Sequence, residues 1–313
     1  MPAKRRKSNY GICNSCEHFQ LEDLEKCAQG IDNAKFNAQT KTCDMYLIKP
    51  EFVERHVSLE IPLNTSMESL TPDFFLNNIF FHGISNSNDV PENQIWLSEY
   101  QAEIAQTYQL IAKTLLLNKF PPSLINKSIA SLDIETTSWM PSAQKGYINH
   151  VSQSYLQFKA DSFLIATYQI INMNRKPENV GSMLLKTWKF LENGQFPQKI
   201  ENSEDIPKDN SLDIQLVFNQ GFDIRILNNC FTKFKLNLHF PETIVDLMKV
   251  HRNLAALEEW LGNEVQFSRT ITEKGNYGEY YALFKKKQIE PISTYNIIDT
   301  LTPLLAYILR NKD

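Results

Sequence analysis

The 313-residue sequence has no run of about 18 uncharged apolar residues, so we do not expect a transmembrane helix. It also has no excess of positive charge, because 32 Lys and Arg stand against 36 Asp and Glu, a formal net charge of −4. A polyanionic partner would therefore have to bind through local patches. The basic residues 4–7 are not followed by an apolar segment, as they would be in a secretory signal. We expect a cytoplasmic or otherwise intracellular protein with reduced or metal-bound thiols.

Cysteine is scarce, and four of the five cysteines lie in one short segment, at Cys13, Cys16, Cys27 and Cys43. Cys13 and Cys16 form a Cys-x2-Cys knuckle, a spacing that lets two thiolates approach one metal from a tight turn. The four thiolates predict a structural zinc site. An iron–sulfur cluster uses the same number of ligands and stays an alternative, while a disulfide is less favoured without an oxidising compartment.

With 42% hydrophobic and 11% aromatic residues, the chain can build a substantial core and is not a disordered protein. Residues 50 to about 93 carry only a weak pattern, and a clear helix follows from Ser98 through Leu117, with apolar residues at helical spacing. A proline pair at 121–122 marks a boundary. We predict a Cys-rich module over residues 1–49, a helical connector over 50–128 and a catalytic-type domain over 129–313.

Within residues 129–313, strand patterns over 129–135, 148–158 and 162–173 predict a three-stranded antiparallel meander. Further on, the pattern predicts helix 177–191, strand 212–218, a helix from residue 222, strand 242–247, helix 254–261 and a terminal helix over 293–309. A meander followed by alternating strands and helices indicates a mixed sheet flanked by helices.

Asp133 and Glu135 stand out in the first of these strands, in the run Leu-Asp-Ile-Glu-Thr-Thr. Side chains alternate along a strand, so the two carboxylates share one face while Leu132 and Ile134 point into a core. Adjacent anions are unfavourable without a cation or a shared proton. The pair therefore indicates a metal site, although a solvated acidic face on an edge strand would give the same pattern.

Three more acidic or phenolic residues complete the pattern. Asp223 begins a helix directly after a buried strand, where α/β sheets gather ligands, and where the helix dipole alone would also favour an acid. Tyr295 and Asp299 are four residues apart and share one helix face. Four carboxylates can hold two divalent ions about 3.5–4 Å apart, the arrangement that hydrolyses phosphodiesters.

The ordered motifs resemble those of the DEDD superfamily of 3′–5′ exonucleases, which have a ribonuclease H-like fold. Asp133 and Glu135 match its first motif, Asp223 its second, and Tyr295 with Asp299 its third. The tyrosine four residues before the last aspartate is typical of the Tyr subclass, and the segment from residue 245 to Asn296 looks most like its YprB-type branch.

The resemblance implies a nuclease that hydrolyses DNA or RNA from single-stranded or frayed 3′ ends with two Mg²⁺ or Mn²⁺ ions. Asp133, Glu135, Asp223 and Asp299 would hold the ions and Tyr295 would orient the attacking water. Thr136 would approach the terminal nucleotide, and Asn219 would support the second motif or simply form a turn. The alternatives are an endonuclease of the same fold and a nucleic-acid-binding or scaffold protein with little catalysis.

A segment near the carboxyl terminus offers a second potential contact to a nucleic acid. Tyrosines 277, 280 and 281 and Phe284 adjoin three lysines at 285–287. Aromatic rings beside ammonium groups suit a single strand, because bases stack on the rings and phosphates meet the charges. The same residues would equally form a strand with packed tyrosines and solvated lysines.

Overall fold

The computed structural model describes residues 53–85, 98–117, 124–125, 127–136, 148–171, 212–233, 240–269 and 289–311. The chain divides into two units between Glu51 and Phe52, and every described residue belongs to the second. Three predicted features lie outside the described residues: the four-cysteine site at Cys13, Cys16, Cys27 and Cys43, the helix 177–191, and the tyrosine- and lysine-rich segment 277–287.

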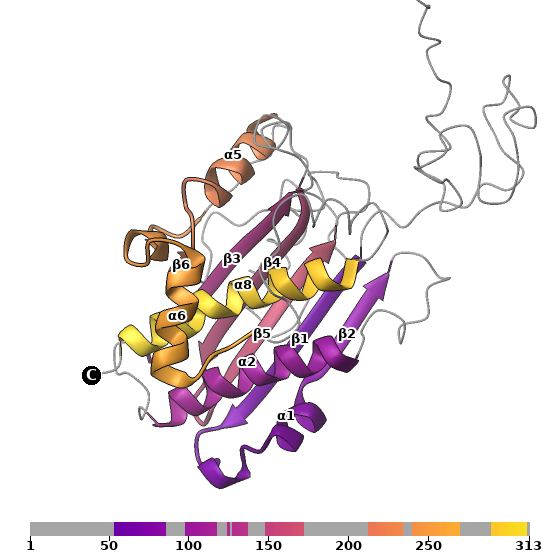
Figure 1. Cartoon of the computed structure of the whole chain (residues 1–313), viewed down its shortest axis with the longest axis vertical. Coiled ribbons are helices and arrows are strands. Elements are labelled where there is room, and N and C mark those ends of the chain that lie inside the picture. Colours follow the sequence, from indigo (N-terminus) through magenta and orange to yellow (C-terminus); the bar gives the residue numbers. More distant parts are fainter. Residues whose placement is uncertain are drawn as a thin grey trace, which may run out of the picture. The chain divides into compact units, whose positions relative to one another are not determined.

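Seven strands form one mixed sheet in the order β2-β1-β5-β4-β3-β6-β7 (Figure 1). The strands are β1 (Val53–Pro62), β2 (Phe80–Ser85), β3 (Ser128–Thr136), β4 (Ile148–Phe158), β5 (Ser162–Ile171), β6 (Ile214–Val217) and β7 (Thr243–Asp246). Strands β3, β4 and β5 are antiparallel neighbours, which confirms the predicted meander. Strands β6 and β7 join parallel to β3, so the sheet is antiparallel on one side and parallel on the other.

The helices confirm the predicted order in most places. They are α1 (Pro72–Asn78), α2 (Ser98–Leu117), α5 (Asp223–Lys233), α6 (Leu254–Val265) and α8 (Ile289–Arg310), with short 3-10 turns at Met67–Ser69 and Leu247–Lys249. Helices α2 and α8 lie side by side across one face of the sheet (Figure 1). Helix α5 packs its apolar residues against the opposite face, where Leu132 and Ile134 of β3 are buried.

The predicted helical connector over residues 50–128 is wrong for its first part. Residues 53–62 form β1, which pairs with β5 over its whole length, and residues 80–85 form β2 at the edge of the same sheet. The physical reason is the alternation in β1: Val57, Leu59 and Ile61 are buried, while the residues between them are more polar. This period-two pattern is the ordinary signal of a strand, and the sheet therefore begins before residue 129.

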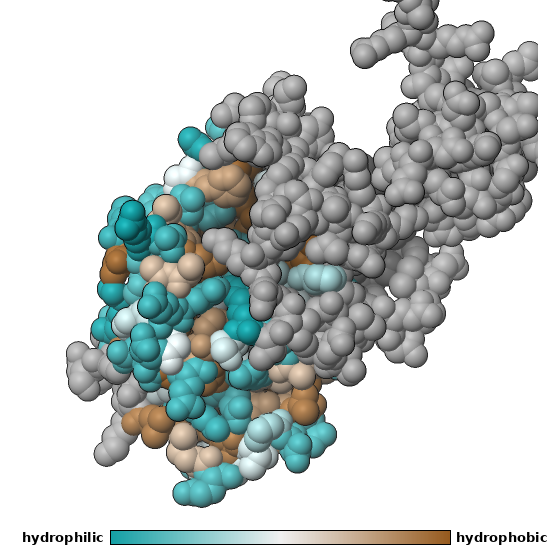
Figure 2. All heavy atoms as spheres, in the orientation of Figure 1, coloured by the Kyte–Doolittle hydropathy of each residue, from teal (hydrophilic) through white to brown (hydrophobic). Residues whose placement is uncertain are grey.

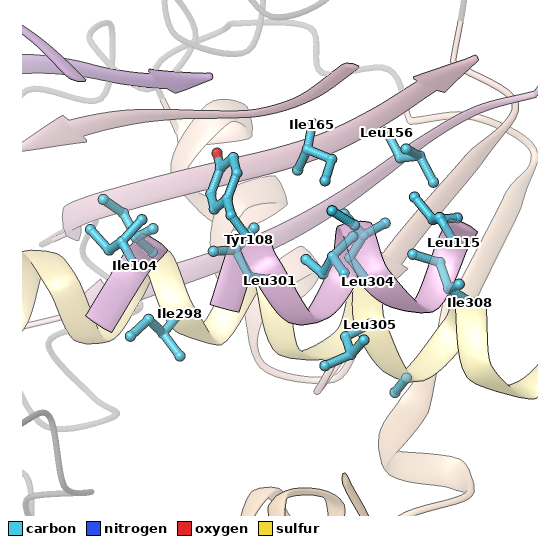
Figure 3. Packing of buried hydrophobic residues seen from close by; sticks show 14 of the residues in the cluster. Ile104, Tyr108, Leu115, Leu156, Ile165, Ile298, Leu301, Leu304, Leu305 and Ile308 are labelled. Atoms are coloured by element: carbon cyan, nitrogen blue, oxygen red, sulfur yellow. The ribbon is translucent and has the colours of Figure 1, made fainter. Parts of the chain in front are cut away.

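The sheet face beneath α2 and α8 changes from apolar to polar along the strands. At one end, Leu156 of β4 and Ile165 of β5 pack against the buried residues of α2 and α8 (Figure 3). Toward the carboxyl end of β3, the same face carries Ser152, Gln169 and Asp133, which the strand register places side by side. A hydrophobic core thus anchors one half of this interface, and a buried polar layer forms the other.

On the surface of the described residues, hydrophilic side chains predominate on the face shown in Figure 2, with apolar ones in small groups. None of the described helices is long and apolar enough to cross a membrane.

Candidate active site

The five side chains predicted to form a site line one pocket of about 290 Å³. Its lining residues are Asp133, Ile134, Glu135, Phe218, Asn219, Phe222, Asp223, Met248, Asn253, Leu254, Tyr295 and Asp299. They come from β3, the turn before α5, the segment before α6, and α8, four parts of the chain that are far apart in sequence. The sheet and α8 therefore bring together the three motifs that the sequence analysis singled out.

Asp133 and Glu135 lie on the α8 side of β3, as their spacing predicted, and Leu132 and Ile134 are buried on the other. One oxygen each of Asp133, Glu135 and Asp299 lies within 4.8 Å of the other two. The register of β3 against β4 shifts directly after Glu135. A bulge of this kind ends regular pairing and re-aims the following side chain, and Thr136 is not among the residues that line the pocket.

Asp223 is the first residue of α5 and is only 3% exposed. The carbonyl of Asn219 accepts hydrogen bonds from the backbone N–H groups of Phe222 and Asp223, at 2.8 and 2.9 Å. Asn219 therefore forms the turn that delivers Asp223 to the pocket, and it also lines the pocket itself. The sequence allowed two roles for Asn219, support of the second motif by hydrogen bonding or formation of a turn. Its backbone forms the turn.

The electrostatics of the pocket disfavour full ionisation of its acids. Burial raises the pKa of Asp133 well above its ordinary value, and the charges of Glu135, Asp299 and Asp223 raise it further. Burial likewise raises the pKa of Asp223, and the Asp299 and Asp246 charges add to this, against a hydrogen bond from the Asn219 backbone. The carboxylates repel one another, so a cation in the pocket would be strongly favoured.

A buried polar layer on the sheet orients Asp133. The side-chain amide of Asn296, next to Tyr295 on α8, donates to Asp133 Oδ2 at 2.6 Å. The Asn296 carbonyl oxygen accepts from Ser152 Oγ at 2.5 Å and from Gln169 Nε2 at 3.1 Å. Because both the NH₂ group and the carbonyl oxygen of Asn296 are hydrogen-bonded, Asn296 cannot turn easily and holds the Asp133 carboxylate in one orientation.

A cation that the sequence did not predict lies at this site, the guanidinium of Arg269, whose side chain is only 5% exposed. Its Nη2 donates to Asp299 Oδ1, and its Nε lies 2.7 Å from Glu258 Oε1. The guanidinium carbon lies 4.7 Å from the centre of the Tyr295 ring. No periodic pattern marks Arg269, since it stands in the segment between α6 and α8, and its only signal was its charge.

The residues of the pocket fit a divalent metal ion. Carboxylate oxygens are the ligands that Mg²⁺ and Mn²⁺ prefer, and three of them already converge within 4.8 Å. The raised pKa values of Asp133 and Asp223 indicate that this convergence is costly when no cation balances it. Asp133, Glu135 and Asp299 would hold an ion, and Asp223, which lines the same pocket, would help to hold a second.

The pocket also has apolar lining residues. Phe218, Phe222, Met248 and Leu254 line it, and Met248 is 40% exposed. The pocket therefore combines carboxylates with apolar side chains, so a molecule with both a polar and an apolar part would suit it.

Comparison of the chain with protein-family models, with curated proteins and with solved structures finds no match.

Proposed function

We propose that this protein is a metal-dependent 3′–5′ exonuclease of ribonuclease H-like fold that hydrolyses phosphodiester bonds of DNA or RNA. The observation that carries the proposal is the convergence of Asp133, Glu135, Asp223, Tyr295 and Asp299 on one pocket. These are the residues of the three ordered motifs on which the resemblance to the DEDD exonucleases rests. The mixed sheet, antiparallel on one side of β3 and parallel on the other, is compatible with such a fold.

Two divalent ions, when bound, supply activation of the attacking water and neutralisation of the leaving oxygen. The chain's own part is to place the groups around that chemistry. Asp133, Glu135, Asp223 and Asp299 would hold the ions, and Asn296 keeps the Asp133 carboxylate in one orientation. Tyr295 is 4% exposed and lines the pocket, and its hydroxyl is the group that would orient the attacking water.

The shape of the pocket suits one terminal nucleotide. Its volume of about 290 Å³ is near the lower end for ligand pockets, so it admits a single unit of a polymer. The carboxylates would face the phosphate through the ions, and the apolar lining residues, Phe218 and Phe222 among them, would contact the base. Stacking on an aromatic ring tolerates any base, which fits removal of nucleotides one at a time.

The deciding experiment is a nuclease assay with end-labelled single-stranded DNA and RNA of equal sequence, with Mg²⁺ or Mn²⁺ added. A 5′-labelled strand should give a ladder that shortens from the 3′ end, and chelation of the metal should stop it. The Asp133→Asn and Asp299→Asn variants should give no ladder, because the carboxylates act as one metal cage. Asp161→Asn, at an exposed position between β4 and β5, should retain full activity.

Three outcomes would contradict the proposal. No ladder with either ion, from protein that binds nucleic acid, favours the binding or scaffold function. Cleavage of a circular single strand, which has no 3′ end, favours an endonuclease. A ladder that persists unchanged in Asp133→Asn shows that the activity comes from a contaminant or from another site.

A further inference from the structure

The strongest feature that the proposed mechanism does not use is the buried cation at the edge of the carboxylate cluster. Arg269 touches two of the five candidate catalytic side chains, Asp299 through Nη2 and Tyr295 through its ring face. Its third neighbour is Glu258, on α6. Burial by itself would lower the pKa of the guanidinium, but the charges of Asp299 and Glu258 outweigh it and raise that pKa.

The chain reaches this position through the end of α6. Gln266 caps the helix in the left-handed conformation, with φ of 59°, and its N–H donates to the carbonyls of Gly262 and Leu261. This reversal is a common way to end a helix. It buries Phe267 in the core beneath α8, and two residues later it brings Arg269 back to Glu258, one turn after the start of α6.

The charge of Glu258 determines what Arg269 does to the pocket. An unpaired guanidinium would cancel one of the four pocket carboxylates and weaken the attraction for a metal ion. Arg269 shares its charge between Asp299 and Glu258, and Glu258, at 2.7 Å, is not among the pocket-lining residues. Glu258 therefore offsets the charge that Arg269 brings to the pocket, while Asp299 gains a buried hydrogen-bond donor.

We propose that Arg269 is a positioning residue of this site: clamped by Glu258, it fixes the carboxylate of Asp299 and the ring of Tyr295 for metal binding. The proposal rests on the metal site of the proposed function, but not on nuclease activity. A carboxylate has two oxygens, so Asp299 can accept from Arg269 on one and bind a cation with the other. Partners of this kind that orient metal ligands typically account for about 10- to 100-fold in metal affinity.

The opposite role for Arg269 would be that of a competitor, a built-in cation that must leave before a metal enters. Single removal of its charge does not separate the two roles, because loss of the positive charge by itself strengthens cation binding. The charge-matched double variant Glu258→Gln/Arg269→Gln does separate them. It removes one negative and one positive charge together, and Gln has nearly the shape of Glu and keeps an amide donor, although a shorter one, in place of the guanidinium. Arg269→Lys keeps the charge but loses the planar fork.

The experiment measures Mn²⁺ binding to the full chain by the loss of the free-ion signal in electron paramagnetic resonance. We expect the double variant to bind Mn²⁺ about 10-fold or more weakly, and Arg269→Lys to be weakened as well. Arg310→Gln is the matched control, since Arg310 lies near Trp260 at the end of α8, over the ring at 5.5 Å. It should bind Mn²⁺ as the unchanged protein does. Circular dichroism of each variant reports whether the fold is retained.

The outcomes separate this inference from the proposed function. Mn²⁺ binding by the double variant that is equal to or tighter than that of the unchanged protein, with the fold retained, overturns the positioning role. If the double variant does not fold, Arg269→Lys decides: unchanged Mn²⁺ affinity overturns the role. Weakened Mn²⁺ binding without any nuclease activity in the unchanged protein supports the role and refutes the exonuclease. No Mn²⁺ binding by the unchanged protein overturns both.

Discussion

Replacing Asp133 by Asn should stabilise the metal-free protein while it removes metal binding. The oxygens of Asp133, Glu135 and Asp299 lie within 4.8 Å of one another. At an effective dielectric constant of about 20, two full charges at this separation repel by roughly 3.5 kcal/mol. Asn has nearly the same shape, and its Oδ1 can still accept the hydrogen bond that Asn296 donates to Asp133. The substitution therefore removes the repulsion and few contacts.

The expected gain is smaller than the full repulsion, because the raised pKa lets Asp133 escape part of it by taking up a proton. We expect the free energy of unfolding to rise by about 1–3 kcal/mol at pH 7.5. For a domain of this size, each kcal/mol raises the melting temperature by roughly 2–4 °C. The increase should therefore be several degrees, in a direction that few substitutions of a buried residue take.

The pH dependence provides an internal check. The folded-state pKa of Asp133 is raised, so the folded protein holds this proton more tightly than the unfolded chain does. The ionised carboxylate then destabilises the fold above the folded pKa, and this penalty disappears as the pH falls toward the ordinary value of about 4. The difference between the Asp133→Asn variant and the unchanged protein should be largest near pH 8 and should vanish near pH 4.

The assay is thermal unfolding with and without 5 mM Mg²⁺ (about the concentration that saturates a weak site), after removal of divalent ions. Mg²⁺ should raise the melting temperature of the unchanged protein and leave that of Asp133→Asn where it is. The exposed Asp161→Asn variant, treated identically, controls for the loss of one negative charge. A melting temperature of Asp133→Asn at or below that of the unchanged protein at pH 7.5, with no trend toward pH 4, would refute the reasoning.

Three further predictions concern the framework around the pocket. Burial and the charge of Arg55 lower the pKa of His150 to about 3; since the unfolded value is about 6.5, stability from this residue is present above pH 6.5 and is lost as the pH falls toward 3. The unchanged protein should therefore lose up to about 1.4 kcal/mol of unfolding free energy per pH unit through His150 as the pH falls from 7.5 to 4.5, and His150→Gln should not show this part of the loss. Urea unfolding across this pH range measures it, and an equal pH dependence of the unfolding free energy in both proteins would contradict the prediction. Asn296→Leu should lower the free energy of unfolding by about 1–3 kcal/mol, because buried partners such as Gln169 lose a hydrogen bond. It should also weaken Mn²⁺ binding. A stable variant with unaltered Mn²⁺ affinity would exclude a role of Asn296 in orienting Asp133. Gln266→Gly should raise the free energy of unfolding by roughly 1 kcal/mol, since a left-handed residue without a side chain is unstrained, and a lower melting temperature would show that the Gln266 side chain has contacts worth more than the strain.

Much of the fold could be predicted from local patterns. The meander of β3, β4 and β5 and the helices α2 and α8 each carry a period that a short window of sequence contains. Strand β1 carries such a period as well, in Val57, Leu59 and Ile61, but its neighbour β5 follows a hundred residues later. No local pattern says that two strands so far apart belong to one sheet, and the prediction of a separate connector failed there.

The candidate site likewise has a part that local sequence patterns predict and a part that they do not. The pocket carboxylates and Tyr295 were predictable because strand and helix spacing sets their faces and because their order matches a known arrangement of motifs. Their supporting contacts were not predictable. Asn296 reaches Asp133 across 163 positions of sequence, and Arg269 reaches Asp299 from a segment without periodicity. Such contacts depend on where whole elements pack, and one amide or guanidinium among many leaves no signal in a single sequence.

Asn296 and Arg269 each orient one pocket carboxylate, and they differ in the charge that they bring to it. Asn296 donates to Asp133 as a neutral group, so it orients that carboxylate without reducing its charge. Arg269 is charged, but Glu258 balances it, so Asp299 is also oriented without a net loss of negative charge in the pocket. Uncompensated lysine or arginine side chains would have stabilised the metal-free cluster more, at the expense of its affinity for cations. The arrangement thus holds the carboxylates in place and leaves the pocket net negative, which is the condition that would favour a divalent ion there.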